Sequence, residues 1–303
     1  MSDVVVLPEA EWRSREAGHH QQVDELLAGH RERADRGRPH PVEDFLFSYY
    51  SFRPSQLRRW HPGAGVGLAG PAATERLEWR EQVRLDGDAA GAGGEVTLDV
   101  AAFLARRGGA VRHVVDLLTA TAARPAQLGC FGLHEWAMVY RQDAEQVRHA
   151  AHPLRLGRAG TDEVVEEHRI RCTHHDAFRF FTAPARPLNL LQPARTDQVA
   201  LEQPGCLHAT MDLYKWAYKL SPALSSELTL DCFRLARQTR ELDMRASPYD
   251  LSELGYLPVR IETADGKAEY VAAQRQIAEL GQHLRQRLLA ACRPLLEQSG
   301  ARA

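Results

Sequence analysis

The sequence lacks the features that mark membrane-bound and secreted proteins. It has no run of eighteen apolar residues, so no transmembrane helix is expected. Its first residues, MSDVVVLPEAEW, carry an acid where a signal peptide needs bases, and their apolar stretch is short. The five cysteines are scattered and form no C-x-x-C pair, a pattern typical of reduced thiols. We therefore expect a cytoplasmic protein that makes no membrane contact.

Signatures of several enzyme classes are also missing. We find no glycine-rich dinucleotide fingerprint, no phosphate-binding loop and no alternation of strands with helices. The formal net charge is −2, so no overall basic field points to nucleic acid. With 303 residues, 44% of them hydrophobic and 26% charged, the chain has an ordinary globular composition. Only local motifs can therefore indicate its function.

Hydrophobic periodicity predicts a mainly α fold, arranged as a single compact domain over residues 1–303. A small β element is also expected. Residues 168–181 alternate in polarity as a strand does, and Asp265-Gly266 within 259–270 is typical of a hairpin turn. Glycine and alanine dominate residues 86–94, where we expect a mobile loop. The expected helices lie at about 9–36, 97–107, 110–122, 207–220, 225–244 and 268–297.

Cysteine, histidine and carboxylate residues recur together in three short segments, Cys130–Glu135, Cys172–Asp176 and Cys206–Asp212. Each segment has a cysteine, then a histidine, then a carboxylate. On a helix, His208 and Asp212 lie four residues apart and share one face. We expect the three segments to form one histidine-rich site, in which the cysteines serve mainly as packing.

Two chemistries fit these segments, beside the interpretation that they are satisfied core residues. In a metal-free pocket, Glu135 and Asp176 are the catalytic carboxylates, and His134 and His174 are their acid–base partners. In the alternative, the site binds a transition metal such as iron or zinc. The spacing matches no standard zinc signature. The ligands of that alternative are His134, His174, His208 and Asp212.

A second group of candidates lies in the segment from Phe52 to Gly63, which places three arginines among aromatic residues. Arginine binds phosphate through two parallel hydrogen bonds, and tryptophan or histidine stacks on a base. The competing interpretation is that these arginines form ion pairs with acids such as Glu43 and Asp44. The predicted substrate-binding residues are Arg53, Arg58, Arg59, Trp60, His61, Trp136 and Trp216.

Four longer stretches carry a resemblance to a known group of proteins: HPVEDFLFSYYSFRPSQLRRWHPG, CFGLHEWAMVYR, RCTHHDAFRFFTAPARPLN and PGCLHATMDLYKWAYKLSP. Over nearly its whole length the chain resembles actinobacterial proteins of this size that are labelled 3-methyladenine DNA glycosylase. The resemblance implies base excision from alkylated DNA. It transfers no catalytic residue, because the chain has no convincing helix-hairpin-helix followed by an aspartate.

Three functions follow as hypotheses. The first is a DNA-repair N-glycosylase or related nucleobase hydrolase without a cofactor, which contacts DNA through the arginine–aromatic segment and stabilises an oxocarbenium-like state with a carboxylate. The second is a metal-dependent enzyme, and the third is a non-catalytic binder of a phosphorylated small molecule. Convergence of the three segment histidines favours the second. A groove that joins Arg58 and Arg59 to Glu135 favours the first.

Overall fold

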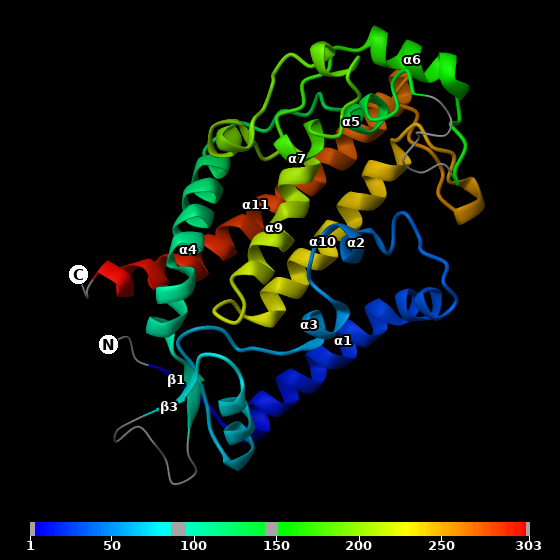
Figure 1. Cartoon of the computed structure of the whole chain (residues 1–303). Helices are drawn as coiled ribbons and strands as arrows, with labels where there is room; N and C mark the ends of the chain where they lie inside the picture. Colours follow the sequence, from blue (N-terminus) through cyan, green and yellow to red (C-terminus); the bar gives the residue numbers. More distant parts are fainter. Residues whose placement is uncertain (1–3, 86–94, 143–150, 301–303) are drawn as a thin grey trace.

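The computed structural model describes residues 4–85, 95–142 and 151–300, so the loop expected at 86–94 lies outside the described residues. The described chain is mainly helical, with a small four-stranded sheet at one end (Figure 1). The prediction of a mainly α fold is therefore confirmed. Within the described ranges, no helix is both long and apolar enough to cross a membrane.

Four helices form the body of the molecule. Helix α9 (Leu207–Lys219) packs against α10 (Ser226–Arg245) and α11 (Ala264–Gly300), while α4 (Val100–Ala122) lies along α11 (Figure 1). Their apolar faces enclose the largest hydrophobic core, in which Phe233 is fully buried. Burial of such side chains is the main source of stability for helices of this kind, and it fixes the neighbouring ends of α9 and α10.

Some helices begin or end where capping residues or glycines in the sequence predict it, and others do not. The Ser225 side chain accepts a hydrogen bond from the Leu228 backbone N–H, 3.3 Å away, and so caps the start of α10. Gly108 and Gly109, in contrast, do not break the chain into two helices as expected. They lie inside the continuous α4, because the flanking apolar residues pack on the core and outweigh the low helix propensity of glycine.

The sheet lies beside the first helix, α1 (Glu9–Asp35). Its strand order is β1-β2-β4-β3, with β1 parallel to β2 and the other two pairs antiparallel. A separate small core, which includes the buried Trp12 and Trp60, packs against it. The strands are β1 (Val5–Leu7), β2 (Val66–Leu68), β3 (Gln82–Arg84) and β4 (Val96–Leu98).

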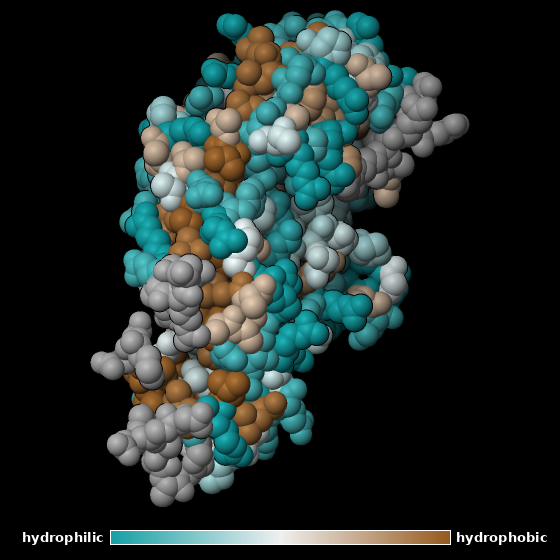
Figure 2. Space-filling view, turned by 60° about the vertical axis from the view of Figure 1, so that its left-hand side comes forward, coloured by the Kyte–Doolittle hydropathy of each residue, from teal (hydrophilic) through white to brown (hydrophobic). Residues whose placement is uncertain are grey.

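Shorter elements complete the described fold, and several of them gather at the end of the bundle remote from the sheet (Figure 1). On the face shown in Figure 2, hydrophobic residues form a broken band between hydrophilic areas. The short α-helices are α2 (Phe45–Tyr49), α3 (Pro54–Arg58), α5 (Leu133–Ala137), α6 (Gly157–Glu167), α7 (His175–Phe178) and α8 (Gln198–Leu201). The 3₁₀ turns are Pro71–Glu78, Arg186–Leu188, Arg195–Asp197 and Ser252–Leu254.

The strand expected at 168–181 is not present. The segment forms one isolated bridge at Ile170 and then turns into α7. The Asn189 side chain takes the place of a neighbouring strand: its amide accepts from the Cys172 N–H at 2.7 Å and donates to the Cys172 carbonyl at 3.0 Å. Because Cys172, Thr173 and His174 are all buried in succession, the alternating pattern did not reflect one exposed and one buried face.

The hairpin expected at 259–270 is also wrong. Asp265 and Gly266 lie in the first turn of α11. The Thr263 hydroxyl accepts a hydrogen bond from the Gly266 N–H at 3.1 Å, which caps the helix, and an acid in the first turn suits the helix dipole. A glycine is required there because a Cβ at Gly266 would meet the Arg260 carbonyl oxygen at 1.9 Å.

Candidate functional site

Two clusters of buried histidine and carboxylate side chains lie where α5, α7 and the start of α9 meet the end of α10. In each cluster, the three ligand-type atoms lie within 4.8 Å of one another. The first cluster is His134, His208 and Asp243, and the second cluster is His174, Glu202 and Asp212.

His208 joins the two clusters. Its ring centroid lies 4.5 Å from that of His134 and 5.3 Å from that of His174. Asp212 follows one turn later on the same face of α9, as expected, and belongs to the second cluster. The three predicted segments therefore do come together, and their histidines converge.

Several of the facing atoms in these clusters are close without being aligned for a hydrogen bond. His134 Nε2 lies 2.9 Å from Asp243 Oδ1, yet neither atom has a hydrogen-bond partner among the described residues. His174 Nε2 lies 3.2 Å from Glu202 Oε1 and 3.4 Å from an Asp212 oxygen, again unaligned. The carboxylates of the second cluster have other partners, since Glu202 Oε1 accepts from Gln198 at 2.5 Å and Asp212 contacts Lys215.

The first cluster is held by a buried arginine on α10. Arg240 donates to Glu135 at 2.7 Å and to Asp243 at 2.9 Å, and its guanidinium lies 3.8 Å from the centre of the Phe45 ring. Burial opposes a charge on His134, but the Asp243 carboxylate outweighs it and raises the pKa of His134 well above its ordinary value. Without another cation, this shift favours the protonated imidazolium form of His134.

The second cluster is held by a tyrosine and a lysine. The Tyr50 hydroxyl donates to Asp212 at 2.8 Å, and the Lys215 ammonium contacts Asp212 and lies 3.4 Å from Asp176. Burial opposes a charge on His174, but the carboxylates of Asp212 and Glu202 raise its pKa to about 9. Burial also disfavours the Asp212 carboxylate, but Lys215 and His174 together hold its pKa below its usual range.

His208 differs from its two neighbours. Burial, together with the positive charges on His134 and His174, lowers its pKa well below the ordinary value. His208 is therefore a neutral imidazole with a free lone pair, which is the form that binds a metal or accepts a proton. The other two histidines take that form only when they lose a proton.

The cysteines of the three segments serve as packing, as expected. Burial raises the pKa of the Cys172 thiol to about 12 and that of Cys206 well above its ordinary value. Cys130 Sγ lies 3.9 Å from His134 Nδ1. The two clusters consist of histidine and carboxylate side chains, so their donor atoms are nitrogen and oxygen.

An open pocket of about 580 Å³ adjoins the second cluster. A smaller inner cavity of about 20 Å³ shares part of its wall, including Asp176, and continues to Glu135, His208 and Arg240. Of the three clustered histidines, His208 is the one that lines this inner cavity. The open pocket is lined by residues that include Tyr49, Asp176, Arg179, Phe180, Lys215 and Lys219.

The predicted arginine contacts lie elsewhere. Arg58 pairs with Asp24 at 3.0 Å, Arg59 lies 5.1 Å from the centre of the Trp79 ring, and Arg53 is exposed at the start of α3. Helix α3 lies near the sheet and α1, far from α5 and α7 (Figure 1). No groove in the described cavities joins these arginines to Glu135.

The aromatic residues predicted to contact substrate are mostly enclosed. Trp60 donates its indole N–H to Glu227 at 2.7 Å, and Trp136 donates to the Ala246 carbonyl at 2.8 Å. Both rings are buried, so neither offers a face for a stacked base. His61 lies against Trp79, with its pKa lowered to about 3 by burial and nearby arginines. Trp216 is buried as well, and the Lys215 ammonium lies 4.5 Å from the centre of its ring.

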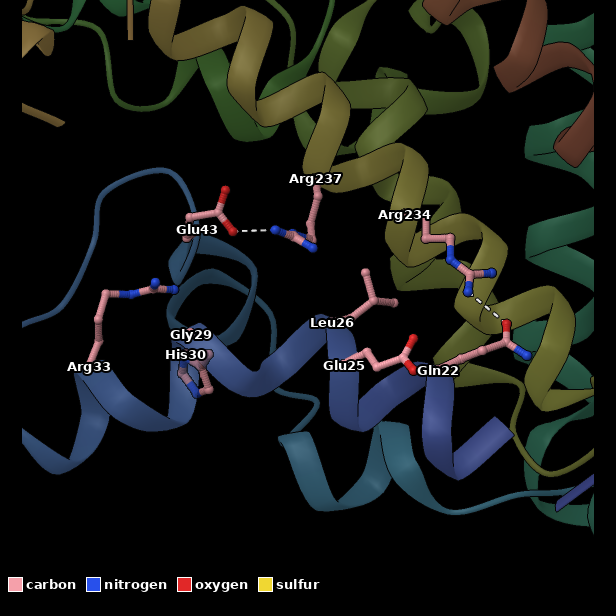
Figure 3. A pocket seen from close by; sticks show the side chains of 9 residues that line it. All are labelled: Gln22, Glu25, Leu26, Gly29, His30, Arg33, Glu43, Arg234 and Arg237. Carbon is pink, nitrogen blue, oxygen red and sulfur yellow. Dashed lines mark hydrogen bonds and ion pairs between the residues drawn. The ribbon is translucent and has the colours of Figure 1, made fainter. Parts of the chain in front are cut away.

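A further pocket, of about 420 Å³, lies between α1 and α10 (Figure 3). Its basic side chains already have partners: Arg237 pairs with Glu43, Arg33 pairs with Asp44, and Arg234 donates to Gln22 at 2.7 Å. In the competing interpretation of the segment 52–63, its arginines pair with acids such as Glu43 and Asp44. Glu43 and Asp44 pair with Arg237 and Arg33 instead. The positive charges that line this pocket are thus largely balanced by neighbouring side chains of the protein.

Five residues of the site escaped the sequence analysis: Tyr50, Glu202, Lys215, Arg240 and Asp243. Asp243 lies in a stretch whose sequence predicts a capped turn, and Glu202 lies in a segment that is predicted to have no regular secondary structure. A compositional signal did exist for Lys215. The chain has only three lysines among its 38 basic residues, and two of them, Lys215 and Lys219, line the open pocket.

No family model matches the chain, and comparisons with curated proteins and with solved structures find no match. The geometry of the site therefore carries the functional argument.

Substitution of Gly205 tests the local packing that places the site. An added Cβ would lie 2.4 Å from the Gln127 carbonyl oxygen, in the turn between Glu202 and His208. We expect Gly205→Ala to lower the free energy of unfolding by roughly 1–3 kcal/mol, as overpacking does. Gly109→Ala is the control, because its Cβ meets open space inside α4 and should stabilise by about 0.5–1 kcal/mol. Urea denaturation measures both, and equal effects would contradict the proposed role of this turn.

Proposed function

We propose that the protein is a metal-dependent enzyme whose centre is formed by the two His/carboxylate clusters. One observation carries the proposal. Six buried nitrogen- and oxygen-bearing side chains converge in two groups, and several facing atoms lie within 3.4 Å without hydrogen-bond alignment. Buried polar atoms normally have hydrogen-bond partners, and a central cation would give the unpartnered atoms of these clusters a partner.

The carboxylates of the clusters can be neutralised in two ways. Protons on His134 and His174 balance Asp243, Asp212 and Glu202 when no metal is bound. A divalent cation balances the same carboxylates and frees the imidazole lone pairs. In the second arrangement, His134 Nε2, Asp243 Oδ1 and His174 Nε2, which have no hydrogen-bond partner among the described residues, gain the cation as their partner.

The protein's own residues have definable tasks around such a centre. Arg240 fixes Glu135 and Asp243, while Tyr50 and Lys215 fix Asp212. These contacts orient ligands, as outer partners of metal sites generally do. A bound transition metal would supply Lewis-acid or redox chemistry. Asp176, which lines both the open pocket and the inner cavity, is placed to exchange a proton with a ligand held there.

Elemental analysis of protein purified without a His-tag tests the proposal. We expect about one equivalent of a transition metal for each occupied cluster. His174→Ala and Asp243→Asn should each reduce the metal content. The matched control is His19→Gln, because His19 is equally buried but bonds the Leu57 carbonyl at 2.9 Å, away from the clusters. Wild-type protein that holds no metal, and takes up neither iron, zinc nor manganese, would refute the proposal.

A second candidate function is hydrolysis of an N-glycosidic bond, with Asp176 as the catalytic carboxylate. The observation that favours it is the place of Asp176 in a pocket with aromatic walls, beside Tyr49 and Phe180. A carboxylate in such a position stabilises positive charge on the sugar. Release of free base from methylated duplex DNA in the presence of chelator, lost in Asp176→Asn, would support it. No release by the wild-type protein would rule it out.

A further inference from the structure

We infer that the open pocket beside the second cluster binds an organic anion with an aromatic body, namely an aryl or heteroaryl phosphate or carboxylate. This inference rests on the proposed function for the chemistry that follows, but binding itself involves residues outside the two clusters. Three features of the pocket carry it: an excess of positive charge, flat aromatic walls and a suitable volume.

The positive charge is concentrated on one side of the pocket. Lys215, Lys219 and Arg179 all line it, and Asp176 is the acid among its lining residues. Arg179 pairs with Asp176 at 3.4 Å, and Lys215 lies at the same distance from Asp176 and also contacts Asp212. Lys219 has no carboxylate within ion-pair distance in the described part of the chain. An anion bound beside Lys219 would therefore supply the opposite charge that this lysine lacks.

The surroundings of Lys219 confirm that its side of the pocket is basic. Burial and the charge of Lys215 lower the pKa of Lys219. The positive charges of Arg195 and Arg107 also lower the pKa of Lys219, and the negative charge of Asp212 raises it. Lysine presents a compact charge on a flexible stem, which suits a tetrahedral phosphate or a carboxylate. The remaining lysine of the chain, Lys267, lines none of the described pockets.

The walls of the pocket are aromatic. Tyr49 stacks on Phe45 with ring centroids 5.0 Å apart, and Tyr218 lies on the far side. Arg179 lies 4.1 Å from the centre of the Phe180 ring and so presents a second flat, cationic surface. Burial raises the pKa of Tyr49 to about 12, so its hydroxyl stays neutral and can donate to an anion. Flat walls of this kind favour a planar ligand.

The volume fits the same class of ligand. Small-molecule sites generally enclose about 300–1,000 Å³, and this pocket of about 580 Å³ falls within that range. The inner cavity then continues from Asp176 toward His208. If the anionic group binds near Lys219, the aromatic end of the ligand would thus extend along the pocket wall toward His208.

Calorimetric titration with phenyl phosphate tests the inference, with inorganic phosphate and benzyl alcohol as probes that carry only the charge or only the ring. We expect phenyl phosphate to bind more tightly than either, and added salt to weaken it. Lys219→Ala should weaken phenyl phosphate binding by roughly tenfold. Lys267→Ala is the matched control and should change nothing. Benzoate, titrated in parallel, decides whether the pocket prefers a phosphate or a carboxylate.

Each titration is run with metal-loaded and with chelator-treated protein. Absence of saturable phenyl phosphate binding in the loaded protein overturns the inference and leaves the metal proposal intact. Binding that requires metal and is unchanged by Lys219→Ala also overturns it, because the metal alone would then hold the phosphate. Lys219-dependent binding to a protein that takes up no metal supports the pocket and refutes the metal centre.

Discussion

From the proposed metal centre, we expect a chelator to lower the melting temperature of the purified protein by several degrees and readdition of the metal to restore it. A ligand that binds only the folded state stabilises it by about 4 kcal/mol at a thousandfold excess over its dissociation constant. The effect should be large here because the carboxylates of Asp212, Glu202 and Asp243 are fully enclosed. Differential scanning calorimetry measures the change.

The metal effect should also depend on pH in a defined direction. In metal-free protein, the pKa of His174 is raised from 6.5 to about 9, so its proton stabilises the fold. That contribution is complete below about pH 6.5 and is lost as the pH rises through about 9. Metal replaces the proton, so the stabilisation by metal should grow over this window. A melting temperature that is the same with and without metal across this range would contradict the metal centre.

Arg240→Leu is expected to cause the largest loss of stability among single substitutions near the site. The leucine keeps an apolar contact with Phe45 but leaves Glu135 and Asp243 buried without their shared cation. Removal of one partner from a buried ion pair generally costs about 3–5 kcal/mol. Urea denaturation followed by circular dichroism measures the free energy of unfolding.

Arg234→Leu on the same helix is the control for that substitution. Its side chain is 41% exposed and pairs with Asp231 at 3.3 Å, so its loss should cost less than about 1 kcal/mol. If the two substitutions had equal effects, the Arg240 ion pairs would not be what holds α5 and α10 together. Metal content should be compared in both variants, because Arg240 also orients Asp243.

The long helices could be predicted from sequence because each one shows its own apolar face. Helices α1, α9, α10 and α11 lie close to the expected ranges, and Ser225 caps α10 as anticipated. The sheet could not be predicted, since its strands are three residues long and pair across large sequence separations. Such short runs carry too little periodicity to be recognised.

The location of the site could be predicted only in part. The repeated Cys–His–carboxylate pattern located His134, His174, His208 and Asp212 correctly in one place. Nothing local marks Asp243 as their neighbour, because its role depends on how the end of α10 packs against α5 and α9. The position of the arginine–aromatic segment could not be predicted for the same reason: the chain folds Trp60 of this segment into a separate core, away from the two clusters.

A row of ionisable side chains runs from the open pocket to the second cluster. Asp176 faces Lys215, Lys215 contacts Asp212, and Asp212 faces His174, which in turn faces Glu202. The charges of these groups alternate in sign along the row. Loss of any one member therefore leaves its neighbours without an opposite charge, so a substitution at the pocket end of the row also disturbs the enclosed end.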